Sequence, residues 1–183
     1  MRSIGAFWRS ISTRRKRVYS ILFILILAII SMIIGSMTTL DYDTAVSRSN
    51  TLNQTLNRAI TSNNLTQTIF INNFSLTLLM FIPLIGVGIG LFIMYNTGAV
   101  LAAITTVQGY PVSLGIAHLM TNPIFWLEFV SYSIAMASSI WLIRRLLQER
   151  WGELKWTAAS IVVCALLLGL GAIIEAWQIT GHI

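Results

Sequence analysis

The sequence is poor in charge. Only 10% of its 183 residues are Asp, Glu, Lys or Arg, whereas an ordinary soluble domain contains about 25%. Apolar residues make up 56%, and the mean hydropathy is +0.77. A soluble domain of this length could not bury so much apolar surface, so the composition excludes a water-soluble enzyme. It also excludes a disordered chain, because disordered chains are rich in charge and poor in apolar residues.

Cysteine and the usual catalytic motifs are also scarce. The single cysteine, Cys164, excludes an internal disulfide framework and a cysteine-based metal site. The sequence contains no GxSxG, HExxH, phosphate-binding loop or GxGxxG pattern of the required spacing. We therefore predict a protein that is not an enzyme and that has no catalytic residues, cofactor or metal.

The apolar residues are concentrated in long runs. A helix of twenty residues is about 30 Å long, which matches the hydrocarbon core of a bilayer. The runs predict an all-α, polytopic membrane helical bundle of about five transmembrane helices, in a single membrane domain over 1–183. The predicted spans are 18–37, 69–95, 98–120, 123–143 and 157–178. We interpret the first span as a retained signal anchor, with cleavage after Ser36 as the alternative.

The first seventeen residues are basic. Apolar residues recur there at spacings of three and four, which predicts an interfacial amphipathic helix; the alternative is a flexible basic tail. We expect the basic residues nearest the first span to lie at the membrane surface: Arg14, Arg15, Lys16 and Arg17.

Glycine, proline and polar residues interrupt the apolar runs. The segment 41–67 is predicted to be a polar outer loop, and the three glycosylation sequons of the chain, two of them in this segment, are weak evidence for glycosylation. Gly86 and Gly90 form a GxxxG pattern, which permits close helix packing either within one protomer or in a homodimer. Tyr95–Gly98 predicts a tight turn. The third stretch is broken at Gln108–Pro111, so a re-entrant hairpin is its alternative.

The distribution of basic residues predicts the orientation. Ten of the twelve lie in 1–17 and 144–156, which are on the same side if five spans alternate. Because cytoplasmic loops are enriched in Lys and Arg, we expect a multi-pass cell-membrane protein with a cytoplasmic N-terminus. The 41–67 loop and the C-terminus would then lie outside.

Five polar residues fall in the outer half of the predicted spans. Ionisable groups within a span cost about 2.5–3.5 kcal/mol at the helix centre, so they often mark functional sites. We predict an outward-facing polar pocket, with hydrogen bonding between helices near the headgroups as the alternative. Its candidate residues are Asn72, Asn73, His118, Glu128 and Glu175.

Several short motifs occur in an order that resembles one known family. They are Ile71-Asn72-Asn73-Phe74, the glycine-rich segment, Tyr95-Asn96-Thr97-Gly98 with Ala99, Ala102 and Ala103, Leu127-Glu128-Phe129, and Ser133-Ile134-Ala135. Over residues 14–178 the chain resembles the stage II sporulation protein M family, and it looks closest to archaeal members. It departs from the family where many members have Pro-His-Gly before the glutamate, because here Asn122-Pro123 stands in that place and His118 lies ten residues upstream of Glu128.

The resemblance implies a non-enzymatic, multi-pass membrane protein. Its expected role is that of a scaffold or accessory subunit, with the lipid bilayer and other membrane or cell-envelope proteins as partners and without nucleic acid. The alternative is a small transporter or channel component that uses the outward-facing pocket.

Overall fold

The computed structural model describes residues 12–39, 41–149 and 151–181, and this part of the chain contains helices and no strands. The predicted interfacial helix falls mostly on residues 1–11, outside the described residues. Arg14 to Arg17 belong to the beginning of the first long helix rather than to a separate segment. The helices are α2 (Thr13–Ser36), α3 (Tyr42–Thr61), α4 (Leu65–Met80), α5 (Gly86–Gln108), α6 (Val112–Thr121), α7 (Pro123–Leu146) and α8 (Glu153–Thr180).

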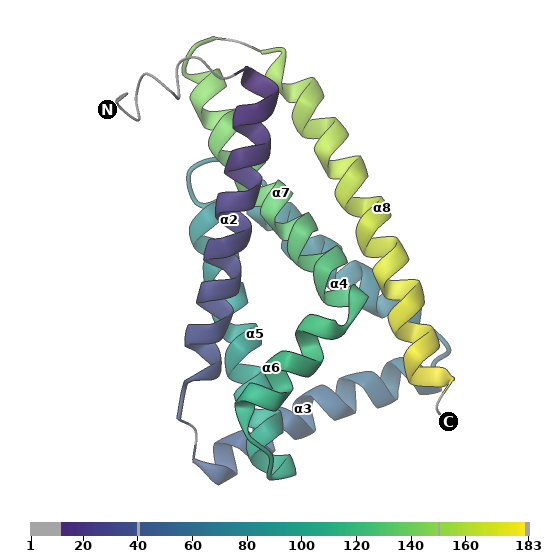
Figure 1. The fold of residues 1–183 in the computed structure, drawn as a ribbon. Helices are drawn as coiled ribbons and strands as arrows, with labels where there is room; N and C mark the ends of the chain where they lie inside the picture. The colour runs from purple at the N-terminus through teal and green to yellow at the C-terminus, as the bar shows by residue number, and fades with distance from the viewer. Residues whose placement is uncertain (1–11, 40, 150, 182–183) are drawn as a thin grey trace.

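Four of these helices, α2, α5, α7 and α8, are long and apolar enough to cross a membrane. Helices α2 and α5 pack side by side and run in the same direction, whereas α7 runs the opposite way (Figure 1). Helix α3 lies across one end of the bundle, between the end of α2 and the end of α8 (Figure 1). We call this the α3 end. The opposite end, which holds residues 13–17, 144–149 and 151–156, is the basic end.

The second apolar stretch is not one continuous span, contrary to the prediction for 69–95. Helix α4 stops at Met80 and α5 begins at Gly86. Pro83 lies in the connection and has no backbone N–H to continue a helix. The next residue, Leu84, has a φ of 78°, a left-handed conformation that turns the chain. The sixteen-residue α4 is about 24 Å long, shorter than a full hydrocarbon core.

The predicted turn at Tyr95–Gly98 is absent, because α5 continues through it. Its polar side chains bond to their own helix: Asn96 Nδ2 donates to Phe92 O at 2.9 Å, and Thr97 Oγ1 donates to Ile93 O at 3.1 Å. Gly98 is buried against α2. Residues that are common in turns are therefore compatible with a helix here, and the chain reverses earlier, at residues 81–85.

The third predicted span, 98–120, also differs from the structure. Gly109 ends α5 with a φ of 73°, and Pro111 then precedes the short helix α6. The predicted span is thus divided between the last turns of α5 and a helix of 10 residues. The fourth and fifth predicted spans correspond to α7 and α8, each of which extends beyond the predicted limits.

Most of the predicted outer loop 41–67 is helical. Asp41 caps α3, because its Oδ2 accepts a hydrogen bond from Thr44 N at 3.1 Å. These hydrogen bonds with the Thr44 side chain and backbone lower the pKa of Asp41 below its ordinary value of 3.8. Ala45 and Ala59 are the buried residues of α3, so small side chains bring it close to the bundle.

Glycines allow the closest helix contacts. Gly35 of α2 packs against the backbone of Tyr95, and Gly98 of α5 packs against that of Met32. A hydrogen bond from Ser31 Oγ to Leu91 O, at 2.7 Å, joins the same two helices. The predicted packing residues lie elsewhere: Gly86 is against the Met80 backbone, and Gly90 is against the Met136 side chain. Both contacts are within one protomer.

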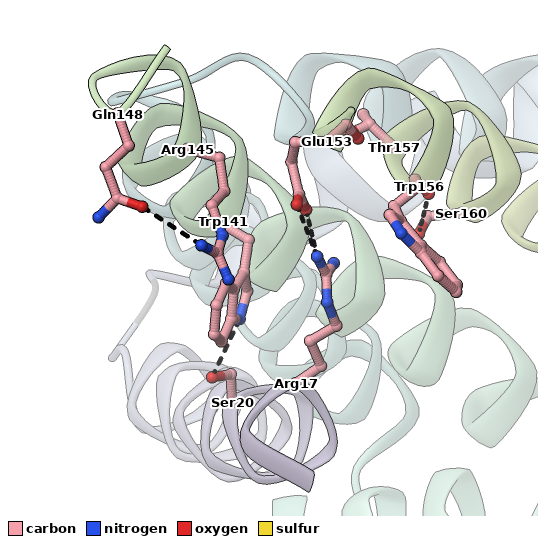
Figure 2. Close-up of polar contacts among 9 residues, drawn as sticks. All are labelled: Arg17, Ser20, Trp141, Arg145, Gln148, Glu153, Trp156, Thr157 and Ser160. Atoms are coloured by element: carbon pink, nitrogen blue, oxygen red, sulfur yellow. Dashed lines mark hydrogen bonds and ion pairs between the residues drawn. The ribbon is translucent and has the colours of Figure 1, made fainter. Parts of the chain in front are cut away.

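An ion pair joins the first and last helices at the basic end (Figure 2). Arg17 Nη2 lies 2.6 Å from both carboxylate oxygens of Glu153. The guanidinium carbon of Arg17 is also 5.0 Å from the ring centroid of Trp141 and 5.5 Å from that of Trp156. Trp141 Nε1 donates to Ser20 Oγ at 3.3 Å. These contacts hold the beginning of α2 against both α7 and α8, so the two basic segments lie at the same end.

Candidate functional site: two adjoining cavities near the α3 end

A cavity of about 700 Å³ lies between α3, α4, α5, α7 and α8. Its lining is mostly apolar and carries a few polar groups, which is the usual character of a ligand site. From α3 come Arg48 and three threonine or serine side chains, and from α4 come Asn72 and Asn73. Helices α7 and α8 contribute Glu128 and Glu175. The amphipathic α3 therefore forms one wall of a cavity whose other walls are the shorter helix α4 and the candidate membrane-spanning helices α5, α7 and α8.

A second cavity, of about 370 Å³, adjoins the first. It is lined by residues of α5, α6, α7 and α8, and it includes His118 and Gln178. The two cavities share four lining residues: Thr97, Glu128, Phe129 and Glu175. The two carboxylates therefore lie at the boundary between the cavities.

The five predicted pocket residues all line these cavities. Asn72 and Asn73 line the first, His118 lines the second, and the two glutamates line both. Asn73 Nδ2 donates to Glu128 Oε1, and Asn72 Nδ2 donates to Asn73 Oδ1 at 3.3 Å. This short chain of hydrogen bonds joins α4 to α7. His118 is exposed. Asn122 and Gln178 line the same second cavity as His118, and Asn122 Nδ2 donates to Gln178 Oε1 at 3.2 Å.

The cavity lining ends at an apolar core on the side of the basic end. Phe129 and Met94 line the first cavity and are also members of the main buried cluster. The cluster continues through Met136 of α7 and through Leu168 and Cys164 of α8. Between Glu128 and Arg144, α7 carries no Asp, Glu, Lys, Arg or His. The site can therefore hold a polar or charged group, and among the described residues of α7 no charged side chain lies between the cavities and the basic end.

Among the polar residues that line the first cavity, the sequence analysis did not identify Arg48, Thr97 and Tyr132, nor the serine and threonine side chains of α3 and α4. Arg48 was assigned to a loop, and Thr97 was assigned to a turn. Tyr132 lies four residues after Glu128, which places it on the same face of a helix, so the spacing alone contained a usable signal. Among the described residues, no cluster of three or more His, Cys, Asp or Glu side chains could hold a metal ion.

Comparison with known proteins gives no further assignment. No family model, curated protein or solved structure matches the chain.

Proposed function

We propose that the protein is a non-enzymatic, multi-pass integral membrane protein that acts as a scaffold or accessory subunit of a membrane complex, as its resemblance to the stage II sporulation protein M family implies. One observation carries the proposal: the cavities near the α3 end stop at the apolar core of Met94, Phe129 and Met136. A carrier for a polar solute needs a hydrophilic route through the bilayer, since an unpaired polar group in hydrocarbon costs several kcal/mol. A binding or scaffold protein needs no such route.

We also propose an orientation in the cell membrane. The described residues of the basic end include seven Lys or Arg and two Glu, whereas α3 carries Arg48 and Arg58 balanced by Asp41 at its cap and Asp43 in its first turn. By the positive-inside rule, the basic end is cytoplasmic and the α3 end is outside. This orientation leaves α3 and the cavities accessible to partners in the cell envelope.

Cysteine labelling tests the orientation. Cys164 is fully buried, so Gly152→Cys, at an exposed position between α7 and α8, introduces the only accessible thiol among the described residues. A membrane-impermeant maleimide applied to intact cells should leave this variant unlabelled and should label Asn50→Cys, at an exposed position on α3. Labelling of Gly152→Cys in intact cells would contradict the proposed orientation and indicate the opposite one.

Partner recovery tests the scaffold function. The tagged protein, purified in a mild detergent and analysed by mass spectrometry, should carry other membrane or envelope proteins. Glu128→Ala should reduce their recovery more than Glu175→Ala, because alanine removes the oxygen that accepts the hydrogen bond from Asn73 and joins two cavity walls. Recovery of the protein only with itself would contradict the scaffold function. If both variants recovered partners as well as the wild type does, the cavity would have no part in partner binding.

A transporter or channel component is the second candidate function. Two observations favour it: the carboxylates lie between two adjoining cavities, and α4 and α6 are too short to span the bilayer. Purified protein in sealed vesicles should then release trapped K⁺ or H⁺ faster than empty vesicles do. Unchanged leakage would exclude this activity for both ions.

A further inference from the structure

Positive charge accumulates at the basic end beyond what its own acidic residues balance. The described residues there comprise Arg14, Arg15, Lys16, Arg17, Arg144, Arg145 and Lys155, with Glu149 and Glu153 as the acidic residues. Glu153 is buried and paired with Arg17 on both of its oxygens. The net excess of five positive charges therefore remains at the ends of α2, α7 and α8.

Two arginines of this group are oriented by one tryptophan. Trp141 is buried, and Arg144 and Arg145 follow it at spacings of three and four on α7, so the three share a helix face. The guanidinium carbons of Arg144 and Arg145 each lie 5.6 Å from the centroid of the Trp141 ring. An arginine held against an aromatic face keeps its N–H edge available for a bidentate contact with an oxyanion.

The edges of these two guanidinium groups are largely unused. Arg145 Nη1 donates to the neutral side chain of Gln148 at 3.3 Å (Figure 2), and no carboxylate is bonded to Arg144 or Arg145 among the described residues. Arg17 differs, because its edge faces Glu153 (Figure 2). Unlike Arg17, the adjacent arginines on α7 are therefore free to bind an anion.

We propose that Arg144 and Arg145 form a binding site for the phosphate of an anionic phospholipid headgroup. The location selects this ligand: both residues are in the last turn of a helix long enough to cross the membrane, where headgroup phosphates lie. Charge complementarity supports it, since each Lys or Arg near an anionic bilayer surface adds to the attraction. Trp141 and the exposed Trp156 are of the type enriched at the same level. The proposal does not depend on the scaffold function.

Native mass spectrometry of the full chain in detergent tests this site. The protein is titrated with phosphatidylglycerol, and in parallel with phosphatidylcholine of the same acyl chains. We expect tighter binding of phosphatidylglycerol, and we expect Arg144→Gln/Arg145→Gln to weaken it about thirtyfold, with little effect on phosphatidylcholine. The matched control is Arg48→Gln/Arg58→Gln, which removes two arginines from α3 and should leave the affinity unchanged.

Two further measurements separate the proposed site from simpler explanations. Arg144→Lys/Arg145→Lys keeps the charge and removes the guanidinium fork, so it should bind phosphatidylglycerol more weakly than the wild type. Inorganic phosphate at the lipid concentration should not displace the lipid. Three results would each overturn the assignment: wild-type affinity of the lysine variant for phosphatidylglycerol, an equal loss of that affinity in the α3 control, or displacement of the lipid by inorganic phosphate. Unchanged binding of phosphatidylcholine shows that the glutamine variant is folded.

Discussion

Replacing Gly98 with alanine should separate α2 from α5. A Cβ built on Gly98 would lie 1.9 Å from Met32 O and 2.7 Å from Ser36 N, both backbone atoms of α2. Real Cβ atoms essentially never approach another atom closer than 3.0 Å, so the two helix backbones must move apart by at least 1.1 Å. A rotamer change cannot relieve this overlap, because the opposing atoms are not in a side chain.

The size of the effect follows from two opposing terms. Overpacking a close-packed interior costs about 1–3 kcal/mol, and the upper part of that range applies where backbone must move. Alanine improves helix propensity over glycine by about 1 kcal/mol. We therefore expect Gly98→Ala to lower the free energy of unfolding by about 2 kcal/mol.

The matched control is Gly88→Ala in the same helix. Gly88 is exposed, and a Cβ there would meet nothing within 4 Å. Unfolding of the detergent-solubilised protein by increasing SDS, followed by tryptophan fluorescence, measures both variants. Gly88→Ala should be as stable as the wild type or more stable. If Gly98→Ala matched Gly88→Ala, the close packing of α2 on α5 would be refuted.

Two further predictions concern the ends of the bundle. Arg17→Gln and Glu153→Gln should each lower the free energy of unfolding by about 1–3 kcal/mol, between the values for exposed and buried ion pairs. The double variant should lose less free energy of unfolding than the two single variants lose in sum. Strictly additive losses in the same SDS assay would disprove an energetic coupling between Arg17 and Glu153. At the α3 end, the pKa of Asp41 is lowered in the folded protein by its bonds to Thr44, so its stabilisation of α3 is present above the ordinary value of 3.8 and is lost as pH falls through the lowered value. The protection of the Thr44 amide, measured as its exchange rate relative to the intrinsic rate at the same pH, should fall over that acidic interval, and Asp41→Ala should remove this fall.

The sequence by itself determined the class of structure and several of its boundaries. The apolar runs indicated an all-helical chain with helices long enough to cross a membrane, and they located α2, α7 and α8 to within several residues. The depth of polar residues within the predicted spans also led to the pocket hypothesis; its asparagines line one cavity, His118 lines an adjoining one, and the two glutamates line both. These features depend on hydrophobicity along the chain, which a linear sequence contains.

Only the tertiary structure decided where the chain reverses and which residues meet. Asn96, Thr97 and Gly98 have the composition of a turn, yet they remain helical because two of them bond to their own helix and the third is buried against Met32. The contacts between Gly35 and Tyr95 and between Arg17 and Glu153 join residues that are far apart in sequence. No local pattern specifies such pairs, because they arise only when the packing of whole helices sets which faces touch.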